Sequence, residues 1–217
     1  MPRIALIHAL AHSVAPVNDG FARDWPRAAR MNLLDDSLSV DLARSGGALD
    51  ARMQARFDTL ADYAVSTGAD AILFTCSAFG PCIEAVARRL APRPVLKPNE
   101  AMIDELAARF PDGARIGLVA TFEPTLSSMP PEFPAHLTVV AKYAAQALDA
   151  LSAGRAEEHD ARIAESARAL HRQGVDAIAL AQFSMARAAP RVSAVVALPV
   201  FTTVGSAIAG LRARLQA

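Results

Sequence analysis

Short apolar runs alternate along the chain with longer segments in which apolar residues recur at helical spacing. The clearest run is Ala71–Phe74, which is long enough for a buried strand and too short for a helix. Thr75, Cys76 and Ser77 follow it directly, and an apolar stripe at helical spacing begins after the next Gly-Pro pair. The pattern predicts a central strand, a polar turn and then the N-terminus of a helix.

The rest of the first half follows the same alternation of strands and helices. We expect strands wherever a short apolar run is bounded by turn residues, and a long helix wherever apolar residues repeat every three or four positions. The expected elements are a strand at Ile4–Ile7, a polar loop from His8 to Asn18, a strand at Met31–Leu34, a helix from Leu49 to Ala64 that ends at Gly68, and a brief strand at Val95–Leu96.

The pattern then begins again, with four segments that echo earlier ones in the same order. Four ordered matches at a nearly constant spacing of 105 to 112 residues indicate an internal duplication. The pairs are ARIGLVATFEPTLSS from Ala114 with PRIALIHALAHSVAP from Pro2, HLTVVA from His136 with RMNLLD from Arg30, GVDAIALAQFSMARA from Gly174 with GADAILFTCSAFGPC from Gly68, and PVFTTVGSAI from Pro199 with PVLKPNEAMI from Pro94.

Strands that alternate with helices predict an α/β fold with parallel sheets. Together with the duplication, this predicts two Rossmann-like parallel-sheet halves related by pseudo-twofold symmetry. We expect residues 1–98 to form the first half, joined by a C-terminal helix over 204–217, and residues 99–203 to form the second. Ligands of such sheets bind outside the carboxyl ends of the strands. The loops that start at His8, Cys76, Thr121 and Gln182 are therefore expected around one shared cleft.

Composition narrows the classes of partner and cofactor. The 217 residues include 22 Lys and Arg and 22 Asp and Glu, and only 6% aromatic residues, so a nucleic-acid partner is not expected. No apolar run approaches the roughly 20 residues of a membrane span. Two cysteines, Cys76 and Cys82, form neither a disulfide framework nor a metal-ligand pattern, which indicates a reducing cytoplasm and no metal. The chain also has no glycine-rich phosphate loop, so we expect no nucleotide cofactor.

Cys76 is the leading candidate for chemistry. A helix N-terminus favours anions and lowers the pKa of a nearby thiol, so this position suits a reactive thiolate or a bound carboxylate. The alternative is an inert cysteine that packs as a small hydrophobic residue. His8 ends the first strand and is expected near the same loops, where it could orient or ionise Cys76, or serve only a structural purpose.

The duplication allows one half to be read against the other. Cys76 corresponds to Gln182, and Ala78 corresponds to Ser184. Gln182 cannot remove a proton, but it donates and accepts hydrogen bonds, so Gln182 and Ser184 are expected to orient a substrate or to stabilise their own turn.

Four further residues carry hydroxyl groups close to these strand ends. We expect them to donate hydrogen bonds to a substrate carboxylate or enediolate. Capping of turns and helices is the alternative for each of them. They are Thr75 and Ser77 in the first half and Thr121 and Thr125 in the second.

These residues resemble those of the aspartate/glutamate racemase superfamily, which includes glutamate, aspartate and hydantoin racemases, maleate isomerase and arylmalonate decarboxylase. The resemblance rests on the IALIHA opening, on TCS after the central strand, on TF-x-PT in the second half and on the duplication. It implies two Rossmann-like halves, a site between them, no cofactor, and in the racemases one cysteine from each half. Cys76 stands at the first cysteine position, whereas Gln182 stands at the second. A racemase that uses two thiols is therefore not expected.

Three functions remain open. The first is a cofactor-independent isomerase or related lyase that acts on a small carboxylate through proton transfer or thiol addition at Cys76. The second is a thiol-dependent hydrolase with Cys76 as acyl acceptor and His8 as base. The third is a non-catalytic binder of small carboxylates. A homodimer is the general expectation for an oligomer of such a protein.

Overall fold

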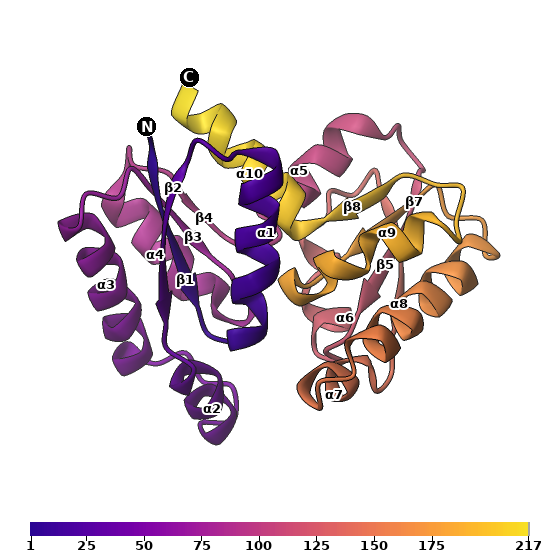
Figure 1. The fold of residues 1–217 in the computed structure, drawn as a ribbon, viewed down its shortest axis with the longest axis horizontal. Coiled ribbons are helices and arrows are strands. Elements are labelled where there is room, and N and C mark those ends of the chain that lie inside the picture. Colours follow the sequence, from indigo (N-terminus) through magenta and orange to yellow (C-terminus); the bar gives the residue numbers. More distant parts are fainter. Residues whose placement is uncertain (217) are drawn as a thin grey trace. The chain divides into compact units, whose positions relative to one another are not determined.

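Residues 1–216 are described in a computed structural model of the chain, and they contain two four-stranded parallel sheets flanked by helices (Figure 1). The chain divides into unit 1, which is Met1–Ala101 together with the residues from Ala207 on, and unit 2, which is Met102–Ser206. The predicted α/β fold with two parallel-sheet halves is confirmed. The two divisions fall three residues beyond the expected limits of 98 and 203, inside helices α5 (Glu100–Arg109) and α10 (Thr203–Gln216).

The sheet of unit 1 has the strand order β2-β1-β3-β4. Its central strands consist almost entirely of buried apolar residues, as expected of a parallel sheet that helices cover on both faces. Helices α3 and α4 lie on one side of these strands and α1 on the other (Figure 1). The strands are β1 (Arg3–His8), β2 (Ala29–Leu34), β3 (Ala71–Phe74) and β4 (Val95–Leu96), and the helices are α1 (Val14–Asp24), α2 (Ser37–Arg44), α3 (Ala51–Ser66) and α4 (Gly80–Leu90).

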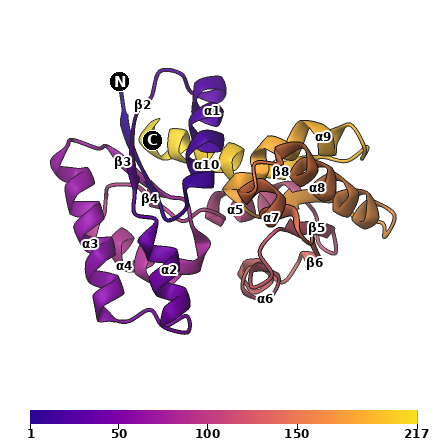
Figure 2. The ribbon, with the colours of Figure 1, turned by 60° about the horizontal axis from the view of Figure 1, so that its bottom comes forward.

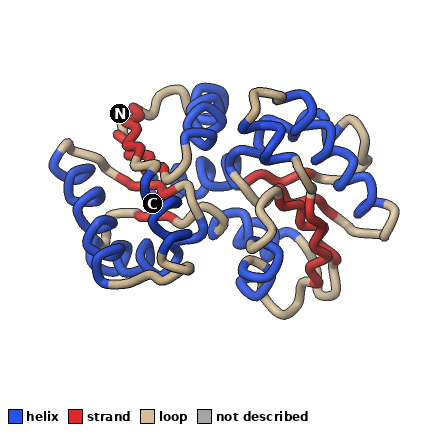
Figure 3. Tube along the Cα trace, turned by 90° about the horizontal axis from the view of Figure 1, so that it is seen from below, coloured by secondary structure: helices blue, strands red, loops and turns tan. Residues whose placement is uncertain are grey.

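Unit 2 repeats this order as β6-β5-β7-β8. Helices again lie on both sides of the sheet (Figures 2 and 3). The strands are β5 (Arg115–Ala120), β6 (Thr138–Tyr143), β7 (Ala177–Leu180) and β8 (Val200–Thr202). The helices, with α5 already given, are α6 (Thr125–Ser128), α7 (Ala147–Ser152), α8 (Ala156–His171) and α9 (Ala189–Ser193).

The same hydrogen bond occurs once within each unit, which supports the duplication. The carboxylate of Asp70 accepts a hydrogen bond from the backbone amide of Arg3 at 2.7 Å, and Asp176 accepts one from Arg115 at the same distance. Each aspartate stands one residue before its central strand, and each arginine begins the neighbouring strand. An acidic side chain therefore fixes the start of the same strand pair twice.

One of the four predicted matches of the repeat is wrong in register. We expected His136 to correspond to Arg30. The first pair of the repeat matches Ile4 with Ile116. In the sheets, Arg30 pairs with Ile4 of β1 and Val139 pairs with Ile116 of β5, so Val139 holds the place of Arg30. The match is displaced by three residues because the connections that lead into β2 and β6 differ in length, which only the hydrogen-bonded pairing reveals.

The predicted polar loop from His8 to Asn18 is also wrong in part. A 3₁₀ turn at Ala11–Ser13 leads directly into α1, which begins at Val14. Pro16 lies in the first turn of this helix, where its missing amide proton breaks no helical hydrogen bond. Asn18 is therefore a helical residue, one turn beyond Val14.

The core of unit 1 beneath α3 is built around three phenylalanines. The ring of Phe57 in α3 lies 5.2 Å from that of Phe74 and 5.0 Å from that of Phe79, measured between centroids. Phe74 ends β3 and Phe79 ends the turn that follows it. The residues on either side of Cys76 in the sequence are therefore both packed against α3.

The C-terminal helix completes unit 1. From Ala207 on, α10 belongs to that unit, and Arg214 forms an ion pair with Glu100. A methyl group added at Gly210 would lie 3.0 Å from the side chain of Ala101, so the glycine permits close packing of α10 against the start of α5. Within the described residues, none of the helices has the length and apolar character needed to cross a membrane.

Candidate functional site

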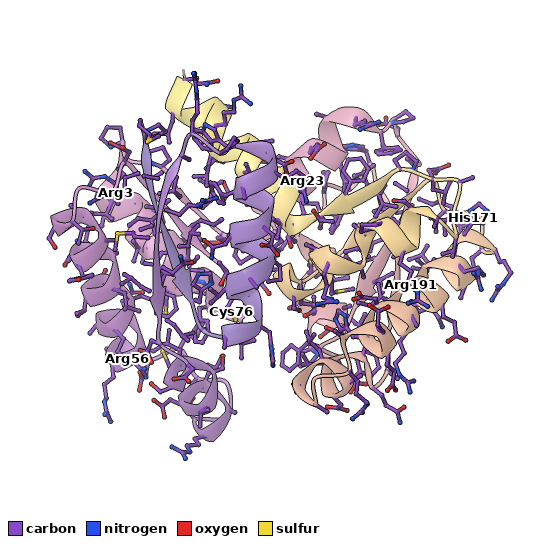
Figure 4. The ribbon with its side chains drawn as sticks, in the orientation of Figure 1. Arg3, Arg23, Arg56, Cys76, His171 and Arg191 are labelled. Carbon is purple, nitrogen blue, oxygen red and sulfur yellow. The ribbon has the colours of Figure 1, made fainter. Side chains whose placement is uncertain are left out.

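Cys76 lies between a strand and a helix, as predicted from the apolar pattern. It is the second residue after β3, and a 3₁₀ turn at Ser77–Phe79 separates it from α4. Figure 4 labels Cys76 at the carboxyl ends of the strands of unit 1. The side chain is a free thiol of intermediate exposure, whereas the thiol of Cys82 is buried in the core beneath α3 and α4.

The expectation of a lowered thiol pKa is wrong. Burial raises the pKa of the Cys76 thiol, and the backbone amide of Ala78 opposes this shift without overcoming it. The physical reason is that Cys76 packs against the aromatic core of unit 1, where a thiolate would be poorly solvated. The resting side chain is therefore the neutral thiol.

A small cavity borders Cys76. Its volume is about 10 Å³, roughly the space that one water molecule needs. Except for His8 and Cys76 its lining is apolar: Ile7, Ala9, Leu38, Phe57, Phe74 and Phe79. The cavity is too small for a substrate, and it leaves the thiol in weakly polar surroundings.

His8 is fully buried, and both of its ring nitrogens have partners other than Cys76. Nδ1 lies 3.0 Å from the hydroxyl oxygen of Thr75, and Nε2 lies 3.0 Å from Oδ1 of Asn32. Burial lowers the pKa of His8, and the hydrogen bond with Asn32 offsets part of that shift. His8 is therefore a neutral imidazole within a hydrogen-bonded chain.

The alternation of side chains along β3 explains why His8 and Cys76 do not pair. Successive residues of a strand point to opposite faces of the sheet. Cys76 packs with Ile72 and Phe74 in the core beneath α3 and α4, whereas Thr75 bonds to His8. The structure brings His8 and Thr75 together, and it does not join either side chain to the thiol.

Two residues of this cluster were not expected from the sequence. Asn32 in β2 contacts His8, and Asn18 in α1 donates a hydrogen bond to Asn32 at 2.9 Å. The chain has only three asparagines. The sequence signal that could have identified Asn32 is that it is a polar residue within the otherwise apolar predicted strand Met31–Leu34.

In unit 2, Gln182 holds the position of Cys76. It follows β7 at the same distance and precedes the 3₁₀ turn Phe183–Ala188. Its Oε1 accepts hydrogen bonds from the backbone amide of Thr121 at 2.9 Å and from the Thr121 hydroxyl at 3.3 Å. Its Nε2 donates to the hydroxyl oxygen of Thr125 at 2.9 Å. The structure thus brings three of the expected residues into one cluster.

The two remaining expected residues lie in the turns. Ser77 is partly exposed at the start of the turn before α4, and Ser184 is buried in the turn after β7. The described residues contain no group of three or more His, Cys, Asp or Glu side chains that could hold a metal ion.

Comparison with known proteins places the chain among racemases and related enzymes. The family model for Asp/Glu/hydantoin racemases matches residues 33–211. A comparison with curated protein sequences finds no match.

Several solved structures share the fold at low sequence identity. Allantoin racemase from Klebsiella pneumoniae is 19% identical, with a TM-score of 0.71 over 100% of this chain and 88% of that one. Glutamate racemase from Thermus thermophilus in complex with beta-chloro-D-alanine is 19% identical, with a TM-score of 0.70 over 99% and 80%. A glycine-to-cysteine mutant of arylmalonate decarboxylase in a sulfate-associated form is 15% identical, with a TM-score of 0.69 over 99% and 94%. With the match of the family model to most of its length, the chain belongs to the Asp/Glu/hydantoin racemase family.

Proposed function

We propose that the protein is a cofactor-independent isomerase or lyase of small carboxylates in which Cys76 exchanges a proton with the substrate or adds to it. Membership of the racemase family supports an enzyme of this class. The observation that carries the proposal is that a partly exposed thiol follows the central strand of unit 1, while an amide holds the same position in unit 2.

A single thiol limits the reaction. Inverting a stereocentre by proton transfer requires a base on one face of the carbon and an acid on the other. Gln182 does not titrate, so it supplies neither. One thiol is sufficient for a lyase step in which a carbon–carbon bond to a carboxylate breaks, carbon dioxide leaves with its two oxygens, and the Cys76 thiol gives its proton to the resulting carbanion. The thiolate then regains a proton from water.

The raised pKa of Cys76 suits this direction of transfer. The neutral thiol is the form that donates a proton, and burial keeps that form dominant at neutral pH. A thiol-dependent hydrolase needs a thiolate or a base that removes the thiol proton, and both ring nitrogens of His8, the expected base, have hydrogen-bond partners other than Cys76. The hydrolase is therefore the less supported alternative.

The Gln182 cluster of unit 2 is proposed as a group that can bind a carboxylate. A backbone amide can only donate, so the atom of Gln182 that faces Thr121 is the oxygen, and the nitrogen faces Thr125. Thr125 then accepts from Gln182 and keeps its own hydroxyl proton. The second proton on Gln182 Nε2 and the Thr125 hydroxyl proton are two donors suited to one carboxylate oxygen or one carboxylate.

The test is proton exchange and carbon dioxide release with a panel of α-amino acids, hydantoins and 2-substituted malonates in deuterium oxide. NMR follows deuterium at the substrate α-carbon for wild type, Cys76→Ala and Cys82→Ala. The proposal expects exchange or decarboxylation with wild type and Cys82→Ala, and at least a hundredfold loss with Cys76→Ala, the scale of one acid–base group. Thermal stabilisation by these compounds without turnover would instead indicate a binding protein, and an acyl adduct on Cys76 a hydrolase.

A further inference from the structure

A chain of hydrogen bonds with a fixed direction runs through unit 1, from the backbone carbonyl of Val14 to the hydroxyl of Thr75. It passes through the side chains of Asn18, Asn32 and His8. In each hydrogen bond, the preceding bond already determines whether one of the two atoms donates or accepts. The direction can therefore be followed from one end to the other.

The chain begins at a backbone carbonyl, which can only accept. Nδ2 of Asn18 lies 2.8 Å from the carbonyl oxygen of Val14, so this end of the amide is identified as the nitrogen. The same nitrogen lies 2.9 Å from Asn32, whose facing atom must accept and is therefore Oδ1. The reciprocal contact, Asn32 Nδ2 to Asn18 Oδ1 at 3.3 Å, agrees with this orientation of both amides.

The direction then passes through the imidazole. Oδ1 of Asn32 is 3.0 Å from His8 Nε2, so Nε2 carries the proton. In a neutral ring, Nδ1 is then a bare acceptor. The Thr75 hydroxyl lies 3.0 Å from that nitrogen and must donate to it. The other acceptor near this hydroxyl, the carbonyl oxygen of Ile7, is farther away at 3.4 Å.

We infer that Asn18 and Asn32 are positioning residues that hold His8 as the neutral, Nε2-protonated tautomer and so make the Thr75 oxygen a hydrogen-bond acceptor. The Thr75 hydroxyl proton is committed to His8, which replaces the expectation that Thr75 donates to a carboxylate. His8 takes part in this chain and not in ionising Cys76.

The inference has a consequence for the substrate, and this consequence rests on the proposed function. A group that contacts the Thr75 oxygen must carry a hydrogen to donate, as an ammonium, an amide N–H or a hydroxyl does. A carboxylate oxygen would be repelled there.

The tautomer of His8 is measured by NMR on the full chain labelled with ¹⁵N at histidine. The His8 signals are assigned from their loss in His8→Gln. At pH 7, wild type is expected to show a protonated Nε2 and an unprotonated Nδ1. Asn32→Leu removes the acceptor of the Nε2 proton and is expected to shift the ratio of the two tautomers about tenfold toward Nδ1–H, since one hydrogen bond is worth about that factor.

Two further variants give opposite expectations. Asn32→Asp keeps an acceptor at the same place and adds a negative charge, so it retains Nε2–H and makes His8 titrate at a higher pH. Asn18→Leu removes the donor that orients Asn32, so the Asn32 amide can turn over and both tautomers are expected. Asn32 is exposed, which makes its replacement tolerable to the fold.

Leu34→Ala, at an exposed position two residues along the same strand, is the matched control and should leave the His8 signals unchanged. The inference is overturned by an Nδ1–H tautomer in wild type, or by folded Asn32→Leu and Asn18→Leu proteins that keep the wild-type ratio. Because the readout is an NMR signal and not turnover, its failure is distinguishable from failure of the proposed function.

Discussion

Cys76 and Gln182 occupy the same position in the two repeats: each is the second residue after its central strand and the last residue before a 3₁₀ turn. One position therefore carries a titratable thiol in unit 1 and a neutral amide in unit 2. The chemistry of the two repeats differs, although their strand order is the same.

The first prediction concerns thiol reactivity. Iodoacetamide should modify Cys76 in the native protein at least about tenfold faster than Cys82, because Cys76 is partly exposed and Cys82 is buried. The rate at Cys76 should keep rising with pH beyond the range of an ordinary exposed thiol, because burial raises its pKa. Mass spectrometry of the alkylated peptides measures both rates. Equal labelling of the two cysteines, or a rate that levels off near neutral pH, would contradict this prediction.

The second prediction concerns the orientation of the Gln182 amide. Gln182→Leu leaves the buried Thr121 amide without its acceptor and should lower the free energy of unfolding by about 1–3 kcal/mol. Gln182→Glu keeps an acceptor for Thr121 and takes a hydrogen bond from Thr125, so its stability should remain close to wild type. The same Gln182→Glu change should abolish stabilisation by small carboxylates, since it places a negative charge where two donors stood. Urea unfolding and thermal shift assays measure these effects, and carboxylate binding by Gln182→Glu would contradict the proposed binding group.

The third prediction concerns pH and stability. Burial lowers the pKa of His8 in the folded protein below its ordinary value of 6.5. Below pH 6.5 the unfolded chain binds a proton at this residue while the folded protein does not, so stability falls as the pH decreases from 6.5 toward the folded pKa. Above pH 6.5 His8 is neutral in both the folded and the unfolded chain, so it makes no contribution to the pH dependence of stability.

The comparison of wild type with His8→Gln isolates that contribution. The urea concentration at the midpoint of unfolding should decrease between pH 7.5 and pH 5.5, and the decrease should be larger for wild type than for His8→Gln. An equal fall in both proteins would show that the folded His8 binds protons as readily as the unfolded one.

The fourth prediction uses the repeated aspartates as a matched pair. Asp70→Ala and Asp176→Ala each remove a charged acceptor from a backbone amide at the start of a strand. Each should cost about 1.5–3 kcal/mol, the range for hydrogen bonds to charged groups. In hydrogen exchange, Asp70→Ala should lower the protection of the backbone amides of β1, and Asp176→Ala should lower that of the amides of β5. A loss of protection spread equally over both sheets by either variant would contradict a local anchor.

The sequence was informative where the signal was local. The apolar run Ala71–Phe74, the polar residues after it and the stripe of α4 are contiguous, and their order was predicted correctly. The start of α1 was missed because polar residues and Pro16 in its first turns resemble a loop.

The parts that could not be predicted depend on contacts between distant residues. His8 bonds to Thr75 and Asn32, which lie 67 and 24 residues away in the sequence. The direction of the Cys76 pKa was misjudged because a helix N-terminus is visible in the sequence, whereas the aromatic core that buries the thiol is assembled from α3, β3 and the following turn.

The division of the chain inside α5 and α10 has a consequence for synthesis. Unit 1 is built from two stretches of the chain, and the whole of unit 2 lies between them in the sequence. Domains generally fold in the order in which they are translated. Here α10 is translated only after unit 2, so the earlier part of unit 1 keeps the surface that α10 covers exposed until unit 2 has been translated in full.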